Sequence, residues 1–199
     1  MNHLKNIAAD IPSPYEGILK ATKAISFDMA SDLSTGSLLK TLTSSKPAGL
    51  FLELGTGSGL ATSWIAARMD QESELITVDN NEVLISIARQ NLVDHRINLV
   101  CADGYEWIKY YQGSPFDLIF ADAIPGKYEM FEETWALLKK GGFYIIDDMQ
   151  KQDNWPDGHD QKAVAFIQAL EDRTDVALTK LDWSTGVIIA VKIFSESGN

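Results

Sequence analysis

The residues with the clearest chemical potential are acidic side chains that follow short apolar runs. Asp79, Asp103 and Asp122 each close such a run, and the paired Asp147 and Asp148 close another. Runs of this kind are typical of strands that are buried on both faces of a parallel sheet. In an open α/β sheet, ligands bind outside the carboxyl ends of the strands. We therefore predict that these carboxylates line one crevice.

A glycine-rich turn follows the earliest apolar run. Residues 49–62, GLFLELGTGSGLAT, predict a buried strand holding one acid, Glu53, then a turn with alternating glycines, then a helix that begins near Gly59. Glycine lets the backbone turn sharply and approach a ligand with no Cβ in the way. The helix start offers free N–H groups and the positive end of its dipole. This combination predicts a pocket for a nucleotide-type cofactor.

Composition narrows the class of protein. The chain has 199 residues, of which 45% are apolar, and a net charge of −11 from 17 basic and 28 acidic residues. Because phosphate recognition needs a basic patch, this charge argues against nucleic-acid partners and against anionic membrane surfaces. No apolar run approaches the roughly 20 residues of a membrane-spanning helix. The first six residues lack the apolar core of a signal peptide, so we expect a cytoplasmic location.

The order of predicted elements is that of a doubly wound α/β fold. Two helices come first, one from the capping box at residues 13–16, with Pro14 at its first position, to about Met29 and one starting near Ser34. The predicted strands cover residues 49–54, 74–79, 97–103, 116–122, 142–148, 176–181 and 186–191. Helical periodicity separates the first six, and the last two lie too close for a helical crossover. We predict a mostly parallel, seven-stranded, Rossmann-like sheet that ends in a C-terminal antiparallel hairpin.

Two further expectations concern boundaries. A helix over residues 127–139 should end at Gly141-Gly142, which would precede the fifth strand. The whole chain, residues 1–199, is expected to be a single domain, with an N-terminal helical cap over 1–46 and the Rossmann-like core over 47–194.

This element order and these motifs resemble the class I S-adenosylmethionine (SAM)-dependent methyltransferases. Within that class the chain is most similar to the small O-methyltransferases related to the catechol and caffeoyl-CoA enzymes, over roughly residues 30–192. The resemblance implies an enzyme that uses SAM to methylate an oxygen of a small-molecule acceptor. Small enzymes of this group are often dimers, so it also allows a homodimer.

The resemblance assigns cofactor roles to individual residues. Glu53 and the turn 55–59 would hold the methionine end of SAM, Asp79 would accept hydrogen bonds from the ribose hydroxyls, and Asn80 would contact the adenosine. Asp103 would bond the exocyclic amine of adenine, with the glycine after it leaving room. Each aspartate also fits a simple strand-end cap. The predicted cofactor-binding residues are Glu53, Gly55, Thr56, Gly57, Ser58, Gly59, Asp79, Asn80, Asp103, Gly104 and Asp122.

The resemblance also implies a metal site at Asp122, Asp147 and Asp148. In related enzymes an Asp after the fourth strand and an Asp-Asn pair after the fifth bind a divalent cation, which would lower the pKa of the acceptor hydroxyl. This chain has Asp148 where the group usually has Asn. Mg²⁺ or Ca²⁺ would suit such ligands, and Asp122 and Asp148 are the predicted catalytic residues. Without a metal, three close acids would repel and one would tend to stay protonated.

Residues 122–128, DAIPGKY, depart from the family pattern. Related enzymes often have a lysine three residues after the aspartate, but here that position is Pro125. Since Pro-Gly indicates a turn, we expect Lys127 to be a surface residue at a helix start. In the loop that follows the fifth strand, Trp155 is predicted to stack on a planar acceptor. His159 is expected to cap the next helix at the surface, with a role as general base as the alternative.

Two other functions remain open at this stage. An NAD-dependent oxidoreductase could use Asp79, 24 residues after Gly55, to hold a ribose. However, the glycine spacing is G-x-G-x-G rather than G-x-G-x-x-G, and the terminal hairpin fits that class poorly. A non-catalytic SAM-binding protein is the other alternative, and it would tolerate loss of Asp122 and Asp147.

Overall fold

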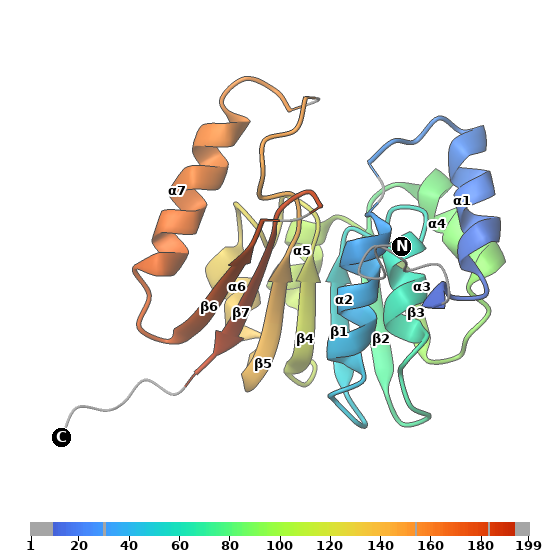
Figure 1. Cartoon of the computed structure of the whole chain (residues 1–199). Coiled ribbons are helices and arrows are strands. Elements are labelled where there is room, and N and C mark those ends of the chain that lie inside the picture. Colours follow the sequence, from blue (N-terminus) through green and yellow to red (C-terminus); the bar gives the residue numbers. More distant parts are fainter. Residues whose placement is uncertain (1–9, 30, 154, 183, 194–199) are drawn as a thin grey trace, which may run out of the picture.

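A computed structural model of the chain describes residues 10–29, 31–153, 155–182 and 184–193. Seven strands form one sheet in the order β3-β2-β1-β4-β5-β7-β6 (Figure 1). The first five strands run parallel, and β7 pairs antiparallel with both β5 and β6. The predicted doubly wound sheet with a terminal antiparallel hairpin is confirmed.

The strands and helices alternate along most of the chain. The strands are β1 (Leu50–Leu54), β2 (Glu74–Asp79), β3 (Ile97–Cys101), β4 (Phe116–Ala121), β5 (Leu138–Ile146), β6 (Val176–Leu181) and β7 (Val187–Lys192). The helices are α1 (Tyr15–Ala24), α2 (Leu33–Thr43), α3 (Leu60–Ala66), α4 (Glu82–Asn91), α5 (Gly104–Tyr110), α6 (Phe131–Ala136) and α7 (His159–Glu171).

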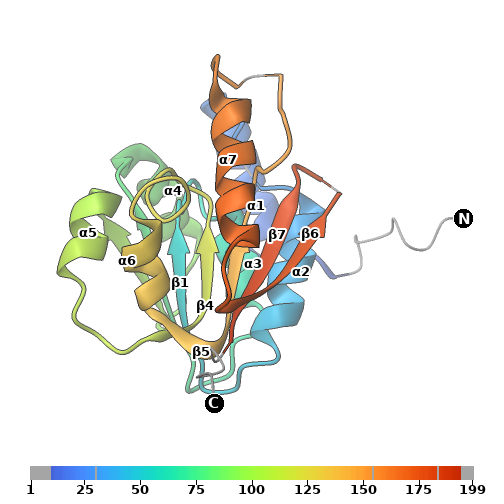
Figure 2. The same ribbon diagram turned by 90° about the vertical axis from the view of Figure 1, so that its left-hand side faces the viewer.

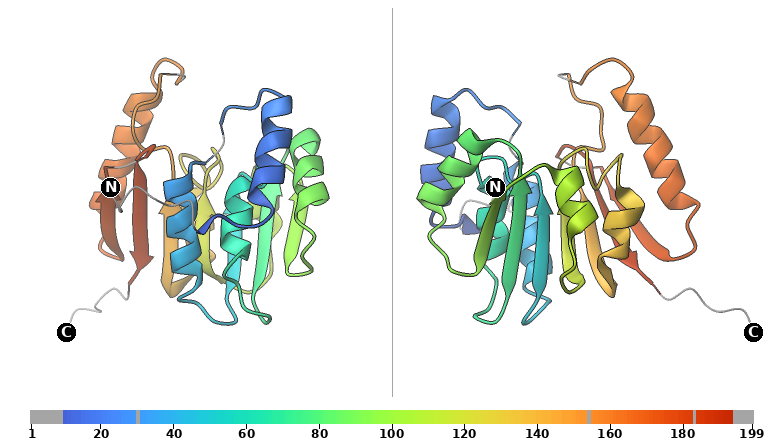
Figure 3. Two further views of the ribbon diagram at one scale, coloured as in Figure 1. Left: turned by 45° about the vertical axis from the view of Figure 1, so that its right-hand side comes forward. Right: turned by 180° about the vertical axis from the view of Figure 1, so that it is seen from behind.

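Helices cover both faces of the sheet, which is why its central strands are apolar on both sides. Along β1, Phe51 faces α2 and α3, whereas Leu52 and Leu54 face the layer of α5, α6 and α7. Helices α1 and α4 pack against α3 around the buried Trp64. The edge-on view separates the two layers (Figure 2), and the view from behind places α5 and α6 in front of the sheet (Figure 3).

Helix α1 is shorter than the sequence predicts. It ends at Ala24 rather than near Met29, and Ser26 adopts a left-handed φ of 55°. The N–H of Phe27 turns back to the carbonyl of Thr22 at 3.3 Å. The segment after the helix is therefore free to run toward the glycine turn, where Phe27 and Met29 help to line a cavity.

The prediction for residues 127–142 is also wrong in part. Helix α6 covers only Phe131–Ala136, and β5 already begins at Leu138, so Gly141 and Gly142 lie inside a strand rather than at the end of a helix. The pairing register shifts where Phe116 faces Leu138 and Leu118 faces Phe143, so β5 carries extra residues at this point. The two glycines therefore mark an irregularity in a strand. Glycine is common at such irregularities as well as at helix ends, so its presence alone does not distinguish the two.

None of the helices in the described part of the chain has the length and apolar character needed to cross a membrane.

Candidate functional site

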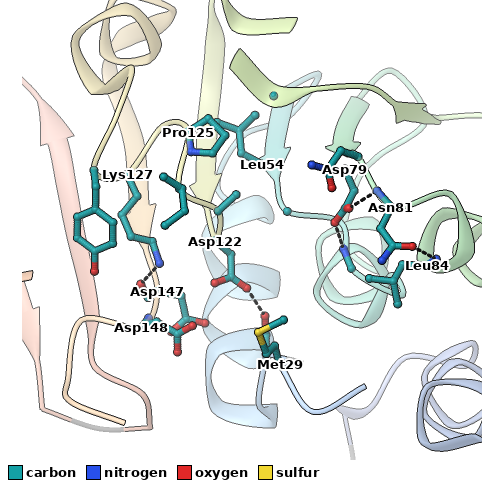
Figure 4. Close-up of a pocket in the computed structure, with 18 of the residues that line it drawn as sticks. Met29, Leu54, Asp79, Asn81, Leu84, Asp122, Pro125, Lys127, Asp147 and Asp148 are labelled. Atoms are coloured by element: carbon teal, nitrogen blue, oxygen red, sulfur yellow. Dashed lines mark hydrogen bonds between the residues drawn. The ribbon is translucent and has the colours of Figure 1, made fainter. Parts of the chain in front are cut away.

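One cavity of about 700 Å³ opens at the carboxyl ends of the parallel strands. Asp79, Asp103, Asp122, Asp147 and Asp148 all line it, although up to 69 residues separate the first from the last. The predicted convergence of the strand-end acids therefore occurs in the structure. Figure 4 shows two groups within this cavity, with Asp79 on one side and Asp122, Asp147 and Asp148 on the other.

On the first side, the acids are held by backbone N–H groups. Asp79 accepts hydrogen bonds from the N–H of Gly57 at 2.8 Å and of Asn81 at 2.9 Å. Asp103 caps α5 by accepting from the N–H groups of Tyr105 and Glu106. The strand-end cap considered as the simpler role is thus present in Asp103, which also lines the cavity together with Asn80 and Gly104.

Two glycines are required by close approach at the seam between the two sides. A Cβ on Gly55, which has a φ of 99°, would lie 2.5 Å from the carbonyl oxygen of Asp122. A Cβ on Gly104 would lie 2.7 Å from Cγ of Pro125. Gly104 therefore makes room for a proline of the opposite wall, whereas the family resemblance assigned it to the adenine.

Glu53 is not among the residues that line the cavity, and its contact with the methionine end of SAM stays a prediction. It is fully buried in β1 and accepts hydrogen bonds from the hydroxyls of Thr62 and Thr77. Burial raises the pKa of Glu53 to about 7, and the two hydroxyls oppose this rise. Glu53 is a core group beneath the glycine turn.

The other side chains of the turn also point away from the main cavity. Thr56 shares a hydrogen bond with Thr77 at 2.6 Å, and Ser58 accepts one from Thr22 of α1 at 2.7 Å. Of the predicted turn residues, only Gly55 and Gly57 line the cavity, while Thr56 and Ser58 border a small hollow beside it. Gly59 packs instead on α4, where a Cβ would lie 2.8 Å from Leu92.

On the second side, the acids lie close to one another and are held by side chains. Ser31 donates to Asp122 Oδ2 at 3.1 Å, and Thr185 donates to Asp147 Oδ1 at 2.5 Å. Burial, followed by the charge of Asp147, raises the pKa of Asp122 well above its usual range. Burial is also the main cause that raises the pKa of Asp147 to about 6. These two carboxyl groups therefore hold protons more firmly than ordinary aspartates.

Lys127 belongs to this second side, so the expectation of a surface residue is wrong. Lys127 is 5% exposed, and its Nζ donates a hydrogen bond to the backbone carbonyl of Asp147 at 2.8 Å. The turn places it there, because Gly126 takes a φ of 86° and its carbonyl accepts a hydrogen bond from the buried Tyr144 hydroxyl. No helix begins at this point, since α6 starts at Phe131.

The predicted metal site does not fit this arrangement. Across the residues that the structure describes, no group of three or more His, Cys, Asp or Glu side chains is placed to hold a metal ion. Asp147 Oδ1 already accepts from Thr185 and from the N–H of Asp148. Asp148 has a left-handed φ of 55°, and the Lys127 ammonium lies against Asp147.

An aromatic wall completes the second side of the cavity. Trp155 and Tyr128 line it and both contact the ring of His159, with centroid distances of 4.4 Å and 5.1 Å. Burial, followed by the charges of Lys127 and Lys162, lowers the pKa of His159. His159 is the first residue of α7 and lines the cavity, whereas the sequence favoured a cap at the surface and gave a role as general base as the alternative.

Sequence reasoning missed several other lining residues, among them Phe27, Met29, Ser31, Pro125, Lys127, Tyr128 and Thr185. The first three lie in the segment that was predicted to be helical or a connection. Thr185 precedes β7, the last strand along the chain. Only Lys127 had a usable signal, because it is the nearest lysine to Asp122 in a family where a nearby lysine is common.

Comparison with known proteins agrees with this geometry. Residues 52–149 match the model of a methyltransferase-domain family. A catechol O-methyltransferase from Mycobacterium tuberculosis is 28% identical over 120 residues, which cover 57% of this chain and 54% of that protein. A Mycobacterium avium protein classed with the O-methyltransferases is 24% identical over 193 residues, covering 89% of this chain and 86% of its own.

Solved structures show the same fold. An O-methyltransferase from Streptomyces achromogenes, solved in complex with SAM, superposes with a TM-score of 0.80 at 22% identity, covering 92% of this chain and 90% of its own. One from Bacillus cereus, in complex with the demethylated product SAH, gives a TM-score of 0.78 at 24% identity, covering 90% of each chain.

The fold, the glycine turn and the match of residues 52–149 to a methyltransferase-domain family support a class I SAM-dependent methyltransferase. Its relatives at 24–28% identity are O-methyltransferases, which supports the subgroup that the motifs of the sequence implied. The oxidoreductase and the non-catalytic binding protein are not favoured.

Proposed function

We propose that this methyltransferase acts on a hydroxyl group of a small, planar molecule, and that the two sides of its cavity divide the work. The side built on Asp79 and Asp103 would hold the adenosine of SAM, and the side of Asp122 and Lys127 would receive the acceptor. The observation that carries this proposal is a single cavity that joins both groups of side chains. Asn80, Gly55 and Gly57 would contact the cofactor from the same wall.

SAM supplies an activated methyl group, so the chain's own residues mainly need to align and deprotonate the acceptor. As the new oxygen–carbon bond forms, the carbon–sulfur bond breaks and its electron pair stays on sulfur. Asp122 would take the hydroxyl proton, because its raised pKa makes its carboxylate a stronger base than usual. Correct alignment of the two reactants can itself lower the barrier by about 7–11 kcal/mol in favourable cases.

The aromatic wall supports a planar acceptor. Trp155 lines the cavity beside His159, and an indole face can stack on a flat ring while Asp148 lies nearby for a second polar group. Trp155 is therefore our substrate contact, and Asp148 an orienting residue. A cytoplasmic location, the absence of nucleic-acid partners, the single-domain division and a homodimer all stay predictions from the sequence.

A panel of acceptors tests the proposal. The purified full chain is incubated with methyl-labelled SAM and with phenols, vicinal diols, aromatic amines and aliphatic alcohols, followed by mass spectrometry of the acceptor. We expect phenols or diols to gain one methyl group, with SAH formed in equal amount. Methylation confined to nitrogen or to aliphatic alcohols would overturn the proposed acceptor, and SAH binding without any turnover would instead favour a binding protein.

A further inference from the structure

The second side of the cavity contains its own cation. Lys127 is almost completely buried, and Figure 4 shows its side chain running to Asp147, with Asp122 and Asp148 close by. The Lys127 charge opposes the rise in pKa of both Asp122 and Asp147, so it lies within electrostatic reach of the two buried carboxyl groups.

The surrounding hydrogen bonds fit an ammonium better than a divalent ion. Lys127 Nζ donates to a neutral backbone carbonyl, while Asp147 Oδ1 is taken by the Thr185 hydroxyl and the N–H of Asp148. Asp122 Oδ2 accepts from Ser31. Mg²⁺ needs about six oxygen ligands in near-ideal octahedral geometry and would also be repelled by the neighbouring ammonium.

The turn before Lys127 explains how this residue reaches the site. Gly126 N–H donates to the Glu129 carbonyl at 2.7 Å, and Lys127 N–H donates to the Ile124 carbonyl at 3.2 Å, closing a compact loop. Gly126 has a φ of 86°, which other residues rarely adopt, and a Cβ there would lie 2.4 Å from Leu54 Cδ1, so glycine suits this close packing on β1. The compact loop therefore fixes the backbone of Lys127 at a position from which its side chain reaches the cavity.

We propose that the Lys127 ammonium is the resident cation of this site, and that methyl transfer proceeds without a divalent metal. Its chemical role rests on the proposed function: the ammonium stabilises the negative charge on the acceptor oxygen while the proton passes to Asp122. Its exclusion of divalent ions depends only on the position of the ammonium among the acids and can be tested without any acceptor.

Manganese binding provides that test, because free Mn²⁺ has an electron paramagnetic resonance signal that falls when the ion is bound. The full chain, saturated with SAH, is titrated with MnCl₂ as wild type, as Lys127→Met and as Lys151→Met. Lys151 is a matched control, since it lies in the nearby loop with a side chain that is 76% exposed. We expect no binding by wild type or Lys151→Met, and Mn²⁺ affinity at least about tenfold higher in Lys127→Met.

Stoichiometric Mn²⁺ binding by the wild type, abolished in Asp147→Asn, would overturn the proposal, as would a folded Lys127→Met that still binds no Mn²⁺. If Lys127→Met does not fold, judged by lost SAH binding, the wild-type titration decides alone.

With an acceptor in hand, wild-type turnover should stay within about twofold after EDTA treatment, and Lys127→Arg should keep more of this turnover than Lys127→Met. Failure of the acceptor panel would leave the Mn²⁺ result intact, so the two proposals fail separately.

Discussion

The two sides of the cavity hold acids of the same type in different ways. Asp79 and Asp103 lie at the ends of β2 and β3 and, within the described part of the chain, accept hydrogen bonds from backbone N–H groups only. Asp122 and Asp147 lie at the ends of β4 and β5, accept side-chain hydroxyls, and have a buried lysine beside them. The first arrangement fixes acceptor atoms at known positions, whereas the second gathers charge and raises pKa values.

This difference teaches that a strand-end carboxylate can serve binding or proton transfer according to its neighbours. Backbone donors fix the position of the carboxylate and leave its remaining lone pairs ready to accept hydrogen bonds from a ligand. Burial among like charges favours the protonated form and makes a carboxyl group able to exchange a proton. Substitutions on the two sides should therefore change different measured quantities.

The largest effect is expected from Asp122→Asn. An amide cannot take a proton, so kcat should fall by about 10²–10⁴-fold with any acceptor that the panel identifies. SAH affinity, measured by calorimetry, should stay close to the wild-type value because Asp122 lies on the acceptor side. A loss of SAH affinity as large as the loss of kcat would place Asp122 in the cofactor contact instead.

Asp79→Ala should produce the opposite pattern. It removes the carboxylate that accepts from Gly57 and Asn81, and with it the proposed ribose contact. We expect SAH binding to weaken by about 10²-fold, equal to loss of a charge-assisted pair of hydrogen bonds, while the domain stays folded. Unchanged affinity in titration calorimetry would remove Asp79 from the cofactor site.

Glu53→Gln tests whether the buried Glu53 affects stability, unlike the acids that line the cavity, which are expected to affect binding or turnover. Because the folded-state pKa of Glu53 is raised from 4.5 to about 7, the folded protein binds more protons than the unfolded chain between these two pH values, and stability falls as pH rises across this range. The free energy of unfolding of Glu53→Gln, taken relative to that of the wild type, should therefore rise by about 2 kcal/mol from pH 5 to pH 8. Urea denaturation at both pH values measures this gain, and an equal difference at the two pH values would contradict it.

The smallest effect is expected from Trp155→Ala, on the aromatic wall. Loss of one stacking surface should raise the KM for a planar acceptor by about tenfold, with little change in kcat or in SAH affinity. Steady-state kinetics with one aromatic and one non-aromatic acceptor provide the comparison. An equal effect on both acceptors would argue that Trp155 holds the loop rather than the substrate.

The fold was predictable because it depends on local patterns. Runs such as residues 116–121 are apolar at every position except one, and the glycine turn marks the point where β1 gives way to α3. Strand order and the convergence of the acids follow from the general rules of doubly wound sheets. The departures are few and have local causes, such as the left-handed Ser26 after α1 and the extra residues in β5.

Which acids face the cavity depends on tertiary contacts that no local pattern contains. The sequence by itself determined the class of the protein. The glycine spacing and the aspartates at the strand ends are local features that can be read along the chain, because backbone geometry requires them at those positions. Only the folded structure decided that Glu53 turns inward to Thr62 and Thr77 while Lys127 turns inward to Asp147. The physical reason is that a side chain's burial and charge environment are fixed by partners distant in the chain, here up to 24 residues away for Glu53 and 20 for Lys127.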